Sequence, residues 1–247
     1  MISKVEGIIV SETAYGDTSK IINVFTKEHG LIGIMAKGVK SLKSKLRSST
    51  ARFTYGTFHI YYKENRLSTL IAVDVVNNLN AIKTDITLVS YMSYITELVV
   101  QVFKQSEDIS IYDLYVNTLL KLEEKLNPLV LTNILEIKLL DYLGIGLNLD
   151  SCIKCGSTNN IVTIDPDYGG YVCNGCYINE KIVDSKSIKL LRMYYYIDIK
   201  SVAKLDIKDD ISFEINNFLE RYYDRYTGLY LKSKNFLNKI LKINTVT

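Results

Sequence analysis

The sequence contains no tryptophan, only two prolines and only two histidines in 247 residues. We interpret the scarcity of tryptophan and proline as nucleotide bias in the genome rather than as a functional signal. The histidines bear on chemistry. His29 precedes Gly30 in a predicted turn and His59 lies inside a strand pattern, so both are expected to be structural. A serine nucleophile elbow, a P-loop and a Gly-x-Gly-x-x-Gly motif are also missing. The sequence therefore predicts a protein that is not an enzyme and has no catalytic residues.

Signals for export and membrane insertion are scarce as well. No cationic-then-apolar leader follows Met1, and we expect no apolar run long enough to span a bilayer. The spacing of the cysteines suits a reducing cytosol. These features predict a cytoplasmic protein without a membrane partner.

The four cysteines form one arrangement with none left over. Two Cys-x-x-Cys pairs are separated by 17 residues, a spacing typical of sites that hold Zn²⁺ between two knuckles. The alternatives are two disulfides or a redox Cys-x-x-Cys, and the spacing favours a zinc site over both. Four thiolates leave no coordination position for water, so the site is expected to hold one structural Zn²⁺ rather than a catalytic ion. The predicted ligands are Cys152, Cys155, Cys173 and Cys176.

The net charge of +3 conceals a segregated pattern. Residues 1–80 carry a net +5, residues 81–150 a net −5, residues 151–184 a net −2 and residues 185–247 a net +5. Charge that is separated in this way suggests separate surfaces with separate partners.

The first eighty residues read as short strands rich in β-branched side chains. Five strands in so short a segment favour a small closed barrel or a compact sandwich, and a barrel removes the exposed strand edges. The strands are expected at residues 4–10, 21–26, 31–37, 53–62 and 67–76.

Helical spacing begins near Asn80 and continues through Phe103, and it returns around residues 111–122. Asn127 and Pro128 predict a helix start, and Gly144 predicts its end. Helical spacing resumes after Ser185, and the last amphipathic helix is expected from about Leu229 to Leu241. The predicted fold class is α+β. The expected domains are a barrel at 1–80, a helical domain at 81–147 and 185–247, and a zinc module at 148–184 inserted into it.

A basic stretch follows the third expected strand, and no Asp or Glu occurs between His29 and Lys63. Serine and glycine are interleaved with the cations, which suits a mobile loop that could bring positive charge to phosphates. Nearby aromatics could stack unpaired bases if they are exposed. A solvated loop beside core aromatics is the plainer interpretation. The candidate phosphate-binding residues are Lys37, Lys40, Lys43, Lys45, Arg47 and Arg52, and Lys20 in the preceding turn could contribute to the same surface. The aromatics are Phe53, Tyr55, Phe58, Tyr61 and Tyr62.

The C-terminal segment after Asp224 contains five cations and no acid. A basic, apolar groove could hold a short acidic peptide with a hydrophobic end, with Lys232 and Lys234 as candidate contacts. A docked terminal helix whose lysines complement its own dipole is the more common explanation.

Several motifs, in this order and spacing, resemble the RecO family of bacterial recombination mediators over nearly the whole chain. They are Tyr15-Gly16-Asp17-Thr18-Ser19-Lys20-Ile21-Ile22, Phe25-Thr26-Lys27-Glu28-His29-Gly30, Ala36-Lys37-Gly38-Val39-Lys40, Ser44-Lys45-Leu46, Glu136-Ile137-Lys138-Leu139-Leu140, Leu143-Gly144 and Leu231-Lys232-Ser233-Lys234.

The resemblance implies an N-terminal OB-fold, a helical domain and a zinc module. It implies binding to single- and double-stranded DNA, annealing of complementary strands, and action with RecR in the nucleoid. It also implies contact with the acidic C-terminal tail of single-stranded DNA-binding protein, so that RecA can be loaded onto coated strands. A nucleic-acid-processing enzyme with a docking zinc ribbon, or an RNA-binding or transcription adaptor, is the alternative.

Overall fold

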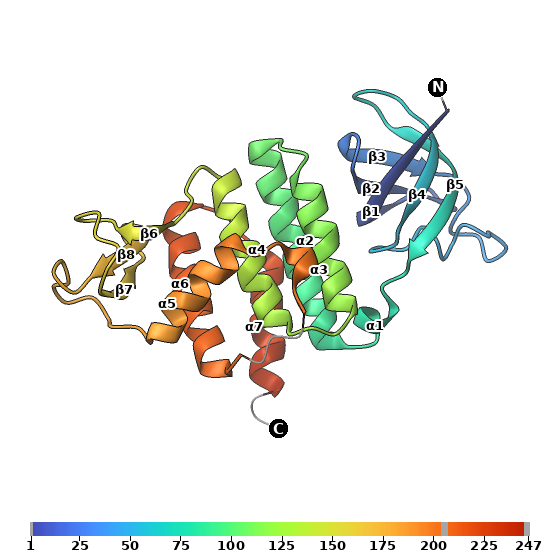
Figure 1. The fold of residues 1–247 in the computed structure, drawn as a ribbon. Helices are drawn as coiled ribbons and strands as arrows, with labels where there is room; N and C mark the ends of the chain where they lie inside the picture. Colours follow the sequence, from blue (N-terminus) through green and yellow to red (C-terminus); the bar gives the residue numbers. More distant parts are fainter. Residues whose placement is uncertain (1, 204–206, 245–247) are drawn as a thin grey trace.

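The computed structural model describes residues 2–203 and 207–244. The N-terminal part is a closed five-stranded barrel with strand order β1-β2-β3-β5-β4, and a bundle of helices follows it (Figure 1). β3 and β5 pair in parallel, and the other neighbours pair antiparallel. The barrel, not the sandwich, is therefore the correct expectation. The strands are β1 (Ile2–Tyr15), β2 (Ser19–Thr26), β3 (Gly30–Ala36), β4 (Tyr55–Tyr61) and β5 (Ser68–Asn77).

Alternation of side chains along these strands fills the barrel interior. Val5, Ile22, Val24, Phe58 and Ile60 are fully buried in one apolar cluster. β1 is longer than expected because it pairs with β4 over its first half and with β2 over its second half. A register shift between Ile9 and Ser11 lets the strand bend around the barrel. This closed barrel is the OB-fold of the N-terminal domain.

The helices carry most of the remaining core. The chain expected to be one helix from Asn80 to Phe103 is two helices, because the Asp85 side chain accepts hydrogen bonds from the N–H groups of Thr87 (2.8 Å) and Leu88 (3.2 Å) and so starts a new one. The helix that begins at Pro128 is capped by Asn127, whose side chain accepts from Leu129 N at 3.0 Å, as expected. The helices are α1 (Asn80–Lys83), α2 (Ile86–Ser106), α3 (Ile111–Glu123), α4 (Pro128–Tyr142), α5 (Ser185–Tyr196), α6 (Asp209–Tyr226) and α7 (Lys232–Asn244), with a 3₁₀ turn at Ile199–Ser201.

A small three-stranded sheet is inserted between α4 and α5 and lies at the end of the molecule opposite the barrel (Figure 1). Its strands are β6 (Asn148–Cys152), β7 (Ile161–Asp165) and β8 (Gly170–Cys173), in the order β6-β8-β7. The hydroxyl of Tyr171 donates to the carbonyl oxygen of Ile188 at 2.6 Å, which ties β8 to α5. The sheet is therefore fixed to the helices by a buried polar contact as well as by chain connection.

The barrel is docked on the helices through an aromatic contact. The ring of Phe25 lies 4.8 Å from that of Phe103 on α2 and 5.6 Å from that of Tyr112 on α3. Tyr112 also donates to the Glu6 carboxylate at 3.2 Å. Burial raises the pKa of Tyr112 far above its usual range, and the nearby Glu6 charge raises it further. This contact fixes how the barrel faces the helices.

α2 corrects one expectation about membranes. It is 21 residues long and contains an 18-residue window with a mean hydropathy of 1.4, so by length and composition it could cross a bilayer. Figure 1 shows it inside the helical bundle, and its residues Tyr94, Ile95 and Leu98 are buried there. The apolar run is the central helix of a folded core, which passes the same test as a membrane span.

Candidate metal centre and nucleic-acid interface

The four cysteine sulfur atoms lie within 4.8 Å of one another, and the sulfurs of Cys155 and Cys173 are 3.6 Å apart. Four thiolates at about 2.3 Å from one tetrahedral ion would be separated by about 3.8 Å. The sulfurs can therefore share one metal ion without a large rearrangement. The expected grouping of Cys152, Cys155, Cys173 and Cys176 is confirmed as a cluster.

Each knuckle is a tight turn at the end of a strand. Cys152 ends β6, and its carbonyl oxygen accepts from Gly156 N at 2.8 Å. Cys173 ends β8, and its carbonyl oxygen accepts from Cys176 N at 3.0 Å. Strand pairing between β6 and β8 then brings the two turns together.

The backbone prepares this cluster for a cation. Burial alone would raise the pKa of the Cys152 thiol, but N–H groups of Cys173, Lys154 and Cys155 offset it and lower that pKa. The pKa of Cys176 is raised, chiefly through its hydrogen bond with Cys155, because a second thiolate beside the first is unfavourable. A bound cation removes that repulsion, so the donor set fits a thiolate-loving ion such as Zn²⁺.

The basic segment between β3 and β4 is a succession of hydrogen-bonded turns held on the barrel. Val39 is fully buried in the barrel cluster, and Leu46 packs against the same cluster. The N–H of Lys40 donates to Thr18 O at 2.8 Å, and its Nζ donates to Gly16 O at 3.3 Å. The segment is thus joined to the β1–β2 turn, and together they make one edge of the barrel.

The candidate cations differ in their surroundings. Lys20 is paired with Glu12 at 2.6 Å, with only 13% of its side chain exposed. Arg52 donates from Nε to Val10 O at 3.0 Å and lies 4.3 Å over the Phe53 ring; burial lowers its pKa. Within the described residues, no ion pair involves the exposed side chains of Lys37, Lys40, Lys43, Lys45 and Arg47.

Two of the five aromatic residues that follow the basic segment are buried, so the expectation that they stack bases is wrong for Phe53 and Phe58, whereas Tyr61 is 50% exposed. Phe58 on β4 is fully buried in the barrel interior, and Phe53, in the turn before β4, is 6% exposed and packs into the cluster shared with the helices. Tyr62 stacks on the ring of His29 with 4.2 Å between ring centres. His59 Nε2 lies 2.6 Å from Asp74 on the neighbouring strand. Both histidines thus make contacts within the fold.

The C-terminal helix α7 is docked on α2. The carboxylate of Glu97 accepts from the backbone N–H groups of Lys232 (3.3 Å) and Ser233 (2.8 Å), which caps α7 at its N-terminus. This cap explains why the helix begins at Lys232 rather than at Leu229. Lys234 is paired with Glu220 on α6 at 3.3 Å, whereas the side chain of Lys232 is exposed. An acid of the chain itself therefore already contacts one of the two candidate peptide contacts.

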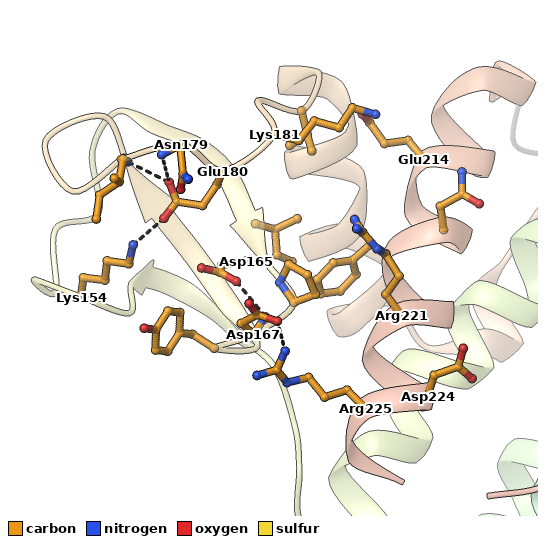
Figure 2. Close-up of a pocket in the computed structure, with 17 residues that line it drawn as sticks. Lys154, Asp165, Asp167, Asn179, Glu180, Lys181, Glu214, Arg221, Asp224 and Arg225 are labelled. Carbon is orange, nitrogen blue, oxygen red and sulfur yellow. Dashed lines mark hydrogen bonds and ion pairs between the residues drawn. The ribbon is translucent and has the colours of Figure 1, made fainter. Parts of the chain in front are cut away.

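A cleft of about 830 Å³ separates the zinc module from α6 (Figure 2). Ion pairs cross or border it, Lys154 with Glu180 within the module and Arg225 with Asp167 between α6 and the module. Asp165 is 6% exposed and accepts from Asp167 N at 2.7 Å within the turn before β8. Asp165 therefore stabilises the turn, and Asp167 joins the module to α6.

One buried polar site has no signal in the sequence analysis. Glu136 on α4 is 4% exposed, and its carboxylate accepts a hydrogen bond from the Tyr94 hydroxyl on α2. Burial raises the pKa of Glu136 to about 7, although the Tyr94 hydrogen bond and Lys234 act in the opposite direction. The position of Glu136 between Leu135 and Ile137 was the available clue, since a buried Glu is rare without partners.

Comparison with known proteins covers both parts of this fold. Residues 1–79 match the family model described as "Recombination protein O N terminal", and residues 83–235 match "Recombination protein O C terminal". The chain is 33% identical over 244 residues to the "DNA repair protein RecO" of Bacillus pumilus, covering 97% of this chain and 95% of that protein. Proteins of the same name from Halalkalibacterium halodurans (32%, covering 97% of this chain and 96% of that one) and Bacillus subtilis (31%, covering 97% and 95%) are similarly related.

Proposed function

The chain belongs to the RecO family of DNA repair proteins, and from this premise we propose that it is a non-enzymatic mediator that binds DNA through its barrel. The observation that carries the proposal is the edge of exposed cations Lys37, Lys40, Lys43, Lys45 and Arg47, which have no ion pair within the described residues. Phosphates bind to such cations with release of counterions and without sequence preference. Lys20 and Arg52 belong to the proposed site as its least available members, because each already has a partner in the fold.

Strand annealing follows from the same surface. Two DNA backbones repel each other, and a cationic edge that contacts both lowers the cost of bringing them together. We propose that the protein binds single- and double-stranded DNA, anneals complementary strands, and helps RecA to load onto strands coated by single-stranded DNA-binding protein. RecR and the acidic tail of that coating protein are the proposed protein partners, and the cytoplasmic nucleoid is the proposed location.

The tail is proposed to bind near the start of α7, where Lys232 is exposed. Lys234 can join it only by leaving Glu220. The cluster of four cysteines is proposed to hold one structural Zn²⁺, which stabilises the module and takes no part in chemistry.

Salt titration tests the DNA site. Five phosphate contacts to a single strand predict a slope of log K against log salt of about −3 to −4. The triple variant Lys43→Gln, Lys45→Gln, Arg47→Gln should reduce the magnitude of this slope by about 2. The matched control changes three exposed lysines elsewhere, Lys104→Gln, Lys186→Gln and Lys208→Gln, and should keep the wild-type slope. Equal slopes for the two triple variants would place the DNA site elsewhere.

Strand annealing with naked and coated single strands tests the mediator role. The wild-type protein should accelerate annealing in both cases, and the loop triple variant should lose this effect. DNA cleavage in Mg²⁺ would instead favour the nuclease alternative, and a clear preference for RNA over DNA would favour the adaptor alternative.

A further inference from the structure

Three branched aliphatic residues of the basic segment, Val39, Leu42 and Leu46, differ in how far the barrel buries them. Val39 is 1% exposed, and Leu46 is packed against the barrel cluster. Leu42 lies between them and is 87% exposed, the largest exposed fraction recorded for a large apolar side chain in the described residues. Ser44 N donates to Ser41 O at 3.1 Å, so Leu42 and Lys43 occupy the corner of a closed turn. The fold thus presents Leu42 to solvent on a short, hydrogen-bonded support.

A single exposed leucine is common on protein surfaces and would carry little by itself. The adjoining segment supplies a second feature. Tyr15, at the end of β1, is 56% exposed. It is followed by the Gly16–Thr18 turn, which is bonded to Lys40 through both Thr18 O (2.8 Å) and Gly16 O (3.3 Å). Two exposed apolar side chains therefore stand on two segments that are tied together at one edge.

The charge around these side chains is almost entirely positive. Lys37, Lys40, Lys43, Lys45 and Arg47 are exposed there, and Asp17 is the one carboxylate on residues 15–20 and 37–54. An acidic or neutral macromolecular surface with apolar groups could approach such an edge, but five cations select a polyanion. In a duplex the base faces are stacked on one another, whereas an unpaired strand offers them to aromatic and apolar side chains.

We propose that Tyr15 and Leu42 contact the bases of an unpaired DNA strand whose phosphates are held by the surrounding cations, so that this edge prefers single-stranded DNA. The inference rests on the proposed function and adds which residues distinguish an unpaired strand from a duplex. Tyr15 supplies a ring on which a base stacks, and Leu42 acts as an apolar wedge between neighbouring bases. Among the aromatic residues after Arg52, Phe53 and Phe58 are buried and cannot reach a base.

The test measures binding of the full chain to three probes of equal length: an oligothymidine, a strand of abasic nucleotides, and a duplex. The double variant Tyr15→Ser, Leu42→Ser should bind the oligothymidine about fivefold to a hundredfold more weakly than wild type. Its affinity for the abasic strand and the duplex should be unchanged, because the phosphate contacts remain. The control Tyr230→Ser, Ile178→Ser alters two exposed side chains outside the barrel (69% and 76% exposed) and should bind all probes as wild type does.

Equal losses by the double variant on all three probes would overturn the inference, since the two residues would then support the loop rather than contact bases. Unchanged binding to the oligothymidine would overturn it as well, while leaving the phosphate site intact. Failure of the wild-type protein to bind any probe in dilute buffer would instead overturn the proposed function itself, and this inference with it. Circular dichroism of both variants shows whether the fold is retained.

Discussion

At the scale of single residues, the buried carboxyl of Glu136 makes the helical core sensitive to pH. Its folded-state pKa is about 7 against an ordinary value of 4.5, chiefly because burial disfavours the charge. A raised carboxyl pKa leaves stability intact below the unfolded-state value and reduces it as the pH rises toward the folded-state value. The free energy of unfolding therefore decreases as the pH rises from about 4.5 to 7, by about 3 kcal/mol in total.

Replacing Glu136 by Gln should therefore raise the free energy of unfolding at pH 8 by up to about 3 kcal/mol, and by much less at pH 5. The amide can still accept the hydrogen bond from Tyr94. Urea unfolding followed by circular dichroism at the two pH values measures the difference. Glu64→Gln, at an exposed position between β4 and β5, is the control and should not show this pH-dependent gain. A Glu136→Gln effect that is the same at both pH values would contradict the assignment.

Gly30 is the residue on which the docking of the barrel depends most directly. It has a φ of +62°, and a Cβ at this position would lie 2.4 Å from the Phe103 ring of α2. Gly30→Ala should therefore cost more than the roughly 1 kcal/mol that a left-handed alanine costs by itself. Gly16→Ala is a matched control in the same barrel, with a φ of +59° and open space around the added carbon. Thermal or urea unfolding of both variants measures the difference, and equal losses would show that Phe103 yields without cost.

At the scale of elements, the small sheet that carries the cysteines is expected to depend on the proposed Zn²⁺ more than any helix does. Its three strands contain five, five and four residues, too few to form a stable sheet alone. The module contacts the helices through Tyr171, through the Arg225–Asp167 ion pair and through buried Leu149 and Ile164. The loop after Cys173 has few regular backbone bonds, so a metal ion shared by the four sulfurs would fix it. Metal removal is thus expected to act locally.

Elemental analysis of reduced protein should find one Zn²⁺ per chain. Its removal by a chelator should abolish hydrogen-exchange protection across residues 148–184 while the barrel strands stay protected, since structural zinc contributes about 10 kcal/mol or more to such modules. Cys155→Ser should weaken zinc binding and reproduce the effect in part. Full protection of the module after complete metal loss would show that the cysteines are not structural ligands.

At the scale of the whole molecule, the barrel and the helices are not independent bodies joined by a linker. Ile8, Val10, Phe25 and Phe53 of the barrel belong to the same buried apolar cluster as the helices. Lys27 also pairs with Asp113 on α3 at 3.5 Å. The edge that carries Lys37, Lys40, Lys43, Lys45 and Arg47 is therefore held in a fixed orientation relative to the helical domain.

A chain truncated to residues 1–80 should consequently expose an apolar face. It is expected to bind a hydrophobic dye such as ANS and to self-associate, whereas the intact chain is not. Phe25→Ser in the truncated barrel should reduce both effects, because Phe25 is the centre of the aromatic contact. Dye fluorescence and light scattering measure the change. A truncated barrel that is monomeric and does not bind the dye would contradict the shared core.

The sequence by itself determined the features that are local or periodic. These include the two Cys-x-x-Cys pairs, the Asn127-Pro128 helix start and the strand alternation. Each depends only on residues that are close together in the chain, so it can be predicted from the sequence. The tertiary structure alone decided which side chains are free to act. The partners of Lys20, Arg52 and Lys234, the burial of Phe53 and Phe58, and the exposure of Tyr15 and Leu42 all depend on segments distant in sequence. Whether a cation or an aromatic ring is free to bind a ligand depends on three-dimensional packing. The sequence is the same whether that side chain faces water or contacts another segment of the chain.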